Sequence, residues 1–272
     1  MLKLGILAGG GELPLVLIRT CREQGRPFHV IALTGHANPA VVADTPHDWV
    51  RLGAAADTFE RLGAAGVEQV VFAGKVARPT LAELRPDWRS MRLIVRIGGR
   101  LLSDNRLLAA IVEEFEYQGF PVVAPSDVTA SLLARSGPYG RLTPTAEEGR
   151  AIVGGFAAAR RVGHRDIGQA AVVQGEAVLG LEGPDGTDAL IARCAARQQG
   201  GSGAILVKAR KPQQEMRADP PVIGLATLRK AAAAGFRGIA VEAGGVLVLD
   251  GAALGDAADA AGMFVVGSDV PP

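Results

Sequence analysis

Two stretches in the second half of the chain combine acidic and basic side chains at spacings that could do chemistry. Residues 182–188 (EGPDGTD) place three carboxylates in one turn, and residues 208–221 (KARKPQQEMRADPP) mix four cations with two carboxylates and three prolines. Basic side chains suit phosphate oxygens, whereas carboxylates suit a divalent cation or an attacking water, so the combination favours phosphoryl chemistry. The alternative is a solvated surface loop with ordinary ion pairs.

A glycine-rich turn, Gly9-Gly10-Gly11, joins the first predicted strand to the first predicted helix. Glycines at that place let an anion approach the backbone N–H groups of a helix N-terminus. The dinucleotide fingerprint needs a third glycine where this chain has Pro14, and an acidic residue about 20 positions later. Residues 24–43 contain no Asp or Glu, so NAD and FAD are not expected. A tight turn that binds no ligand is the alternative.

The histidines and cysteines form no spacing typical of a metal site: His29, His36, His47, His164, Cys21 and Cys194. We therefore expect two reduced, buried thiols, and we expect any metal to be Mg²⁺ or Mn²⁺ held by oxygen. The sequence contains neither the GxSxG elbow of serine hydrolases nor a P-loop.

A series of arginines at three- and four-residue steps, with apolar residues between them, predicts a helix with one basic side: Arg85, Arg89, Arg92, Arg96 and Arg100. We call this set the arginine stripe. The commoner explanation of such a pattern is a solvated helix face. The functional alternative is contact with anionic lipid headgroups.

Around these residues, unbroken apolar strands alternate with helical patterns, which predicts a doubly wound, Rossmann-like α/β domain with a parallel sheet over residues 1–135. Its expected strands are 2–8, 27–33, 69–73 and 120–123, and its expected helices are 12–22, 57–65, 104–118 and one after Ser126. Residues 136–144 (SGPYGRLTP) are expected to be a linker.

A second α/β domain is expected over residues 145–272. It begins with a helix over 145–161 that Thr145 caps, followed by a hairpin of 170–174 and 177–182. The remaining expected helices are 187–197, 225–234 and one ending at 261, and the remaining strands are 204–208, 239–242, 246–249 and 263–266.

The composition excludes several classes of protein. The 272 residues carry a net charge of +1 and only 4% aromatic residues, which argues against nucleic acid as a partner. The N-terminal apolar run is too short for a signal peptide, and no stretch approaches 18 uncharged apolar residues. We expect a cytoplasmic protein that could touch a membrane surface.

Six motifs follow one another along nearly the whole chain: GILAGGGELP (5–14), AGKVARP (73–79), DIGQ (166–169), DGTDAL (185–190), KARKPQQEMRADPPVIG (208–224) and GIAVEAGGVLVLD (238–250). Together they resemble the LpxI-type UDP-2,3-diacylglucosamine pyrophosphatases of Gram-negative lipid A synthesis. The resemblance implies two domains with substrate between them, a homodimer, and metal-dependent hydrolysis to UMP and 2,3-diacylglucosamine 1-phosphate. The resemblance also implies that water attacks the sugar-side phosphorus.

The resemblance also assigns roles to residues. The family's RxDxP segment is Arg217-Ala-Asp219-Pro-Pro here, which makes Asp219 the catalytic residue and, with Asp188, a ligand of Mg²⁺ or Mn²⁺. The expected substrate-binding residues are Gly10, Gly11, Glu12, Gly74, Lys75, Asp104, Asn105, Gln169, Thr187, Lys208, Gln214 and Arg217. Two departures stand out: the family's Gly-Asp-Asp is Ser103-Asp104-Asn105, and its Glu-Gly-Thr-Asp begins with Asp185.

The expected partners are UDP-diacylglucosamine, a second copy of the chain and inner-membrane lipid, so we expect the protein to associate peripherally with the inner membrane. Two alternatives remain open from the residues alone. One is a hydrolase of another nucleotide sugar, because the sequence does not measure acyl chains. The other is a non-catalytic protein that binds nucleotide or lipid, with carboxylates that only fold a loop.

Overall fold

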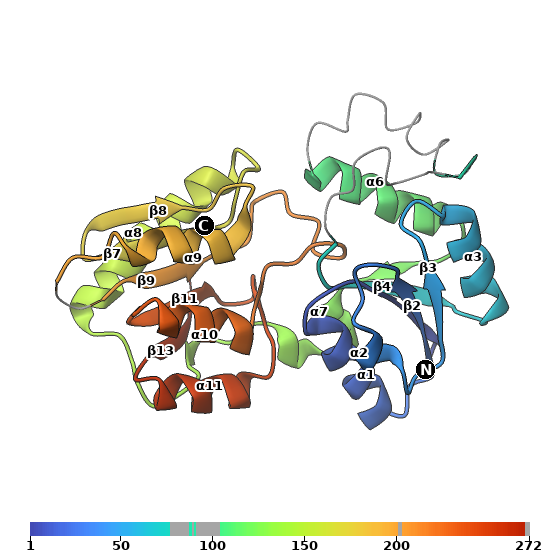
Figure 1. Ribbon diagram of the computed structural model, residues 1–272, viewed down its shortest axis with the longest axis horizontal. Helices are drawn as coiled ribbons and strands as arrows, with labels where there is room; N and C mark the ends of the chain where they lie inside the picture. Colours follow the sequence, from blue (N-terminus) through green and yellow to red (C-terminus); the bar gives the residue numbers. More distant parts are fainter. Residues whose placement is uncertain (77–86, 89, 91–103, 201–202, 270–272) are drawn as a thin grey trace. The chain divides into compact units, whose positions relative to one another are not determined.

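The computed structural model describes residues 1–76, 87–88, 90, 104–200 and 203–269, which form two compact units (Figure 1). The first unit comprises Met1–Thr129 together with Glu215–Asp219, and the second comprises Ala130–Gln214 and Pro220–Pro272. Each unit has its own sheet and its own core, so the two-domain α/β architecture predicted from the sequence is confirmed.

The first unit contains a five-stranded sheet with the order β3-β2-β1-β4-β5, and its strand pairs are parallel. Chain order therefore changes direction between β1 and β4, as at the ligand-binding switch point of Rossmann-like sheets. The described elements are β1 (Leu4–Ala8), α1 (Leu13–Glu23), β2 (Phe28–Leu33), α2 (Pro39–Val42), β3 (His47–Val50), α3 (Ala55–Ala64), β4 (Gln69–Ala73), α6 (Asp104–Tyr117), β5 (Val122–Val123) and α7 (Pro125–Val128).

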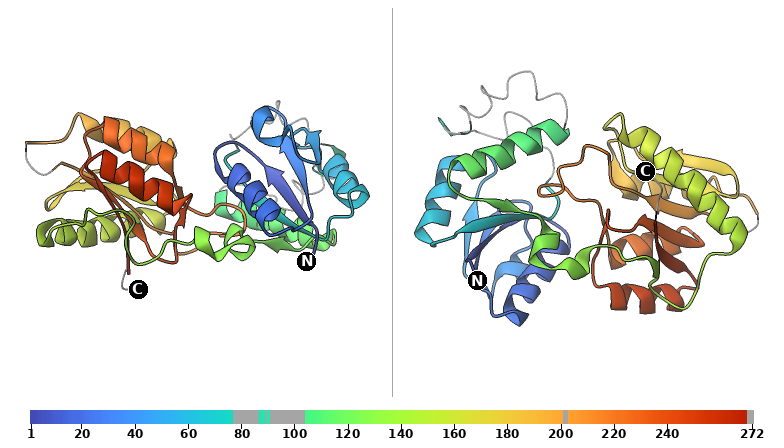
Figure 2. Two further views of the ribbon diagram at one scale, coloured as in Figure 1. Left: turned by 90° about the horizontal axis from the view of Figure 1, so that it is seen from below. Right: turned by 180° about the vertical axis from the view of Figure 1, so that it is seen from behind.

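Helices cover both faces of this sheet (Figures 1 and 2). On one face, Phe59 of α3 and Phe115 of α6 pack edge to face, with ring centroids 4.9 Å apart, over Ile31 and Val70 of the strands. Helices α1 and α7 contact each other and the central strands β1 and β4. Burial on both faces explains why the central strands are almost wholly apolar.

The second unit contains a six-stranded mixed sheet with the order β6-β13-β11-β9-β7-β8, and a two-stranded sheet of β10 and β12. Its three central strands, β13, β11 and β9, are parallel. Strands β6 and β7 pair antiparallel to them on either side, and β8 pairs antiparallel to β7. The described elements are β6 (Gly137–Pro138), α8 (Ala146–Gly163), β7 (Ala170–Gln174), β8 (Ala177–Leu181), α9 (Gly186–Ala195), β9 (Ile205–Lys208), β10 (Val222–Ile223), α10 (Leu225–Ala233), β11 (Gly238–Glu242), β12 (Leu247–Val248), α11 (Gly251–Ala260) and β13 (Phe264–Ser268).

Helix α8 lies on one face of the second sheet, and α9, α10 and α11 lie on the other (Figure 2). The predicted cap of α8 is present. The Thr145 hydroxyl accepts from the Glu148 N–H at 3.2 Å, and the Glu148 carboxylate accepts from the Thr145 N–H at 2.7 Å. This reciprocal pair satisfies two backbone donors at the helix start. The buried Glu148 also pairs with Arg237 at 2.9 Å.

Both cysteines are buried free thiols, as predicted, Cys21 in the first unit and Cys194 in the second. Burial raises the pKa of each thiol, so both stay protonated at neutral pH. No helix within the described ranges is long and apolar enough to cross a bilayer.

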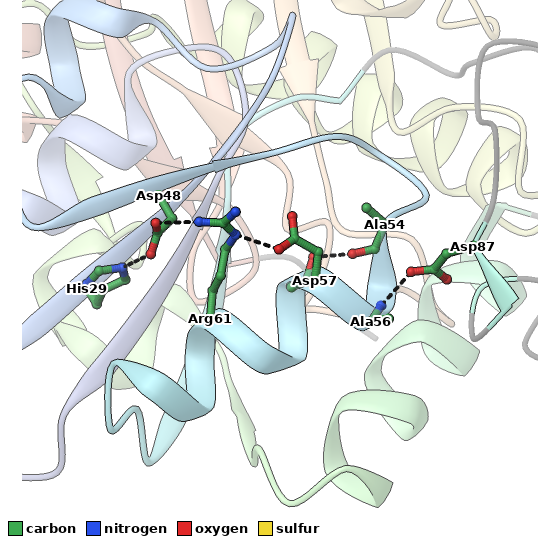
Figure 3. Close-up of polar contacts among 8 residues, drawn as sticks. His29, Asp48, Ala54, Ala56, Asp57, Arg61 and Asp87 are labelled. Carbon is green, nitrogen blue, oxygen red and sulfur yellow. Dashed lines mark hydrogen bonds and ion pairs between the residues drawn. The ribbon is translucent and has the colours of Figure 1, made fainter.

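The N-terminus of α3 is capped from a distant part of the sequence (Figure 3). The Asp87 carboxylate accepts from the Ala56 N–H at 2.7 Å, and the Ser90 hydroxyl accepts from the Ala55 N–H at 3.3 Å. Ala54, the local N-cap residue, has no side-chain acceptor to offer. Residues 87 and 90 therefore satisfy helix donors that the local sequence leaves open.

The outer face of α3 extends this polar network toward β2 and β3 (Figure 3). Arg61 bridges Asp57 at 2.7 Å and Asp48 at 2.6 Å, and His29 Nε2 lies 2.9 Å from Asp48. Burial raises the pKa of Asp48, but the hydrogen bonds from His29 and Arg61 outweigh it and hold that pKa below its ordinary value. The network ties the edge strand β3 to the helix beside it.

Candidate functional site

The turns that follow β1 and β4 lie side by side at the switch point of the first sheet. Gly10 and Lys75 exchange two backbone hydrogen bonds of 2.8 Å, and the Gly9 N–H donates to the Ala73 carbonyl at 2.8 Å. A Cβ at position 9 would lie 2.6 Å from the Lys75 carbonyl oxygen, and one at Gly74 would overlap the Gly10 carbonyl oxygen. Glycine is therefore required at positions 9 and 74 by the contact between the two turns.

The N-terminus of α1 lies beside these turns and has no side-chain cap for its backbone N–H groups. Its N-cap residue, Glu12, makes no capping hydrogen bond, and Gly11, at a φ of +91°, has open space where a Cβ would point. An uncapped helix N-terminus suits an anion, because its N–H groups and dipole favour negative charge. A small hollow adjoins it, lined by Ala8, Gly9, Gly11, Pro14, Ala37, Asn38, Val41 and Val42.

In the second unit, two buried opposite charges are joined through a threonine. The Glu182 carboxylate accepts from the Gln169 N–H at 2.6 Å and from the Thr187 hydroxyl at 2.5 Å. The Lys208 ammonium donates to Thr187 Oγ1 and to the Val222 carbonyl, each at 3.1 Å. Glu182 is 5% exposed and Lys208 is 6% exposed, so each needs these partners to offset its lost hydration.

This cluster brings together three of the predicted substrate-binding residues, Gln169, Thr187 and Lys208. Glu182, one of the three carboxylates of the EGPDGTD turn but not among the predicted site residues, is the carboxylate that holds the first two. The sequence feature that could have identified Glu182 as a site residue is its position directly after a strand, in the EGPDGTD turn. The side-chain Oε1 of Gln169 is buried and accepts no hydrogen bond from the residues that the structure describes.

The predicted metal ligand Asp188 lies one residue further along α9, where its carboxylate pairs with Lys230 of α10. Both side chains are about half exposed. Across the described part of the chain, no three His, Cys, Asp or Glu side chains are grouped as a metal site would need. A protein cage for a metal is therefore not formed by these residues.

The loop after β9 is held by contacts of its own. Lys211 pairs with Asp166 at 2.9 Å, and Gln214 Oε1 accepts from the Lys211 N–H at 3.0 Å. Asp166 has a positive φ of 55°, which is uncommon for a residue other than glycine. The predicted substrate residue Gln214 is thus a structural partner of this loop.

The next five residues, Glu215–Asp219, group with the first unit although the chain on both sides belongs to the second. Asp219 was expected in the C-terminal domain, because each domain was expected to be one continuous stretch of chain. Asp219 is exposed, and its N–H donates to the Glu215 carbonyl at 3.0 Å. Arg217 pairs with Glu116 of α6 at 2.8 Å.

Comparison with known proteins matches both halves of the chain. The LpxI N-terminal domain matches residues 3–132, and the LpxI C-terminal domain matches residues 135–266. The chain is also 39% identical to UDP-2,3-diacylglucosamine pyrophosphatase LpxI of Caulobacter vibrioides, over 276 aligned positions that cover 99% of this chain and 98% of that protein. The chain belongs to the LpxI family.

The two LpxI domains meet near the boundary between the structural units, which lies between Thr129 and Ala130. The segment 136–144, expected to be a linker, carries β6, which pairs with β13 inside the second unit. Its two residues join an existing sheet edge and need no apolar pattern of their own, so the sequence gives no sign of them.

Other predicted site residues lie wholly or partly outside the described part of the chain. Asp104 and Asn105 begin α6, and their side chains lie outside the described part of the structure. The arginine stripe, Arg85, Arg89, Arg92, Arg96 and Arg100, also lies outside the described residues. Its helix stays a prediction.

Proposed function

We propose that this LpxI-family chain is a UDP-2,3-diacylglucosamine pyrophosphatase of lipid A biosynthesis. It hydrolyses the diphosphate of its substrate to UMP and 2,3-diacylglucosamine 1-phosphate, with water attacking the sugar-side phosphorus. The observation that carries this proposal is the full-length match to a relative of that name, with both LpxI domains matched in order.

In the first unit, the proposed contacts with the substrate are made by the turns after β1 and β4. Gly11 and Glu12 would offer backbone N–H groups beside the α1 N-terminus to a phosphate or a nucleotide group. Gly10, whose N–H donates to the Lys75 carbonyl, would contact the substrate through its Cα hydrogens. Gly74 allows the second turn to approach the first, and the exposed Lys75 adds a positive charge. Asp104 and Asn105 at the start of α6 belong to the same proposed set.

In the second unit, the proposed contacts are Gln169, Thr187, Lys208 and Gln214. The buried Lys208 ammonium raises the local positive potential toward a diphosphate, and its position is fixed by Thr187 and Val222. The buried Oε1 of Gln169 has no donor among the described residues, so a hydroxyl or amide N–H of the substrate would satisfy it.

Asp219 is the proposed catalytic residue. Its carboxylate is exposed at the end of a turn that two prolines follow, a position from which it can accept a proton from the attacking water. Arg217, two residues earlier, is proposed to contact substrate, and it pairs with Glu116 of α6 at 2.8 Å.

Activity of the purified full-length chain on UDP-2,3-diacylglucosamine tests the assignment, with UMP release as the readout. Asp219→Asn should lower kcat by at least about 100-fold, because loss of a general base removes a transition-state interaction. KM should rise by no more than about tenfold, from loss of the proposed metal contact. Asp256→Asn, an exposed aspartate on α11, is the matched control and should keep wild-type rates. Comparable turnover of UDP-N-acetylglucosamine would instead support a hydrolase of other nucleotide sugars, and binding without turnover would support a binding protein.

Mg²⁺ or Mn²⁺ is the proposed cofactor, with Asp188 and Asp219 as protein ligands. Mg²⁺ is commonly held by one or two carboxylates together with substrate phosphate oxygens, which fits a chain whose described residues form no complete cage. The bound ion would neutralise charge on the diphosphate and polarise the phosphorus. Asp188 must exchange its partner Lys230 for the ion.

Mn²⁺ binding measured by electron paramagnetic resonance tests this cofactor without relying on turnover. Binding should be weak for the chain alone and tighten by at least tenfold with a non-hydrolysable diphosphate analogue, since the analogue completes the ligand set. Asp188→Asn and Asp219→Asn should each remove that gain. Equal binding by wild type and both variants would contradict the proposed ligands.

We further propose that the protein is a cytoplasmic homodimer that works at the inner-membrane surface, to which the arginine stripe draws it. Basic residues near an anionic bilayer contribute about 1 kcal/mol each and lose it within a Debye length. Replacing Arg89, Arg92 and Arg96 by Glu should weaken binding to anionic liposomes, while activity on detergent-dispersed substrate is kept. Equal liposome binding by wild type and the triple variant at low salt would contradict the membrane role.

The molar mass measured by light scattering after size exclusion tests the proposed homodimer.

A further inference from the structure

The turn that carries Asp219 is held by one arginine that pairs with two glutamates. The Arg217 guanidinium donates through Nε and Nη2 to the two carboxylate oxygens of Glu215, at 2.9 and 2.8 Å, and through Nη1 to Glu116 Oε1 at 2.8 Å. We call Glu116, Arg217 and Glu215 the clamp. A guanidinium engaged by two carboxylates in this way is fixed in both position and plane.

The clamp acts on a short turn whose own hydrogen bonds are local. The Glu215 carbonyl accepts from the Ala218 N–H at 3.1 Å and from the Asp219 N–H at 3.0 Å, so Glu215 and Asp219 form the two ends of one turn. Ala218 packs, partly buried, against the core beneath α3 and α6. Glu116 reaches this turn from α6, about one hundred positions earlier in the chain.

The position of Glu116 is not explained by the stability of its own helix. Glu116 lies in the last turn of α6, where the helix dipole favours cations, and that turn contains no basic residue. A carboxylate at this place is mildly unfavourable for the helix taken alone. Its bond to Arg217 provides the compensating interaction, and the same bond places the turn of Asp219 on the first unit.

We propose that Glu116 is a positioning residue for Asp219, acting through Arg217 to keep the turn 215–219 docked on α6. The role rests on the proposed catalytic function of Asp219. Glu116 touches neither substrate nor the reacting atoms in this account. Losing its charge frees the turn to move, and small displacements of a catalytic carboxylate are costly to the rate.

The test compares substitutions at Glu116 with the same substitutions at Glu113, an exposed glutamate one turn earlier on α6. Glu116→Gln should lower kcat about tenfold and Glu116→Lys about 100-fold. KM should rise by no more than about threefold, through the proposed substrate contact of Arg217. Glu116→Asp should restore part of the loss. Glu113→Gln and Glu113→Lys should stay within twofold of wild type. Circular dichroism and thermal unfolding of all variants identify any that fail to fold.

A second readout follows the turn itself. Amide hydrogen exchange of the peptide containing Ala218 and Asp219 should be faster in Glu116→Gln than in wild type, and unchanged in Glu113→Gln. In an Arg217→Lys background, Glu116→Gln should have less than half of its effect on kcat, since the two residues act together. Wild-type kcat in folded Glu116→Lys would overturn the proposal. Full activity of Asp219→Asn would instead overturn the catalytic assignment, whatever Glu116 does.

Discussion

Glu215 shows how one side chain couples ionisation to the geometry of a loop. Hydrogen bonds from the Arg217 guanidinium lower the pKa of the Glu215 carboxyl, and partial burial opposes them without cancelling them. The same pair raises the pKa of Arg217, first through its hydrogen bonds to Glu215. Because the folded-state pKa of Glu215 is depressed, its contribution to stability is present above its ordinary pKa and is lost as the pH falls through the folded value.

Comparison of wild type with Glu215→Gln across pH should reveal this linkage. Above about pH 4.5, the ordinary pKa of a glutamate, wild type should be the more stable, by no more than about 1 kcal/mol because the Arg217 side chain is 37% exposed. The difference should shrink as the pH falls below that value. Urea unfolding at pH 3 to 7 measures it, and a difference that grows toward pH 3 would contradict the pairing.

At the scale of elements, the paired turns after β1 and β4 depend on glycine for two separate reasons. Gly74 and Gly11 both have a positive φ, near +90°, but only Gly74 also faces a neighbouring backbone. Gly74→Ala should therefore destabilise the protein more than Gly11→Ala. Gly11→Ala should cost about 1–2 kcal/mol from backbone strain alone, and Gly74→Ala at least ~1 kcal/mol more from overlap. Urea unfolding of both variants measures the two losses of unfolding free energy. Equal losses would contradict the prediction.

The long-range cap of α3 gives another prediction at this scale. Asp87→Ala removes the acceptor of the Ala56 N–H and should cost about 1 kcal/mol of unfolding free energy, as for other helix caps. Glu60→Gln, an exposed position on the same helix, is the control and should change little. A neutral Asp87→Ala would mean that water caps the helix equally well.

Most helices and strands were predictable because burial gives them an apolar pattern, and the exceptions have physical causes. β3, with the sequence HDWV, was missed because an edge strand exposes one side and can carry His47, Asp48 and Trp49. α2 was missed because four residues are too few for a helical period. The Asp87 cap could not be anticipated, since it depends on residues 31 positions apart.

At the scale of the whole molecule, the sequence predicted the two α/β domains but not the unit to which Asp219 belongs. Among the contacts of the described residues, Glu215–Asp219 meets the first unit through the salt bridge of Arg217 to Glu116 and through the packing of Ala218. Neither leaves a periodic pattern in five residues. Residue types therefore favoured phosphoryl chemistry, whereas the structure indicated which part of the molecule holds the proposed catalytic residue.

Hydrolysis of UDP-2,3-diacylglucosamine by the full-length chain in H₂¹⁸O, followed by ³¹P NMR, tests the central claim most directly. A wild-type reaction should yield UMP and 2,3-diacylglucosamine 1-phosphate, with the ¹⁸O-induced shift on the sugar phosphate alone, and Asp219→Asn should yield neither product at a comparable rate. Absence of hydrolysis by the folded wild-type protein with Mg²⁺ or Mn²⁺ present would contradict the assigned activity, and ¹⁸O in UMP would contradict attack at the sugar-side phosphorus.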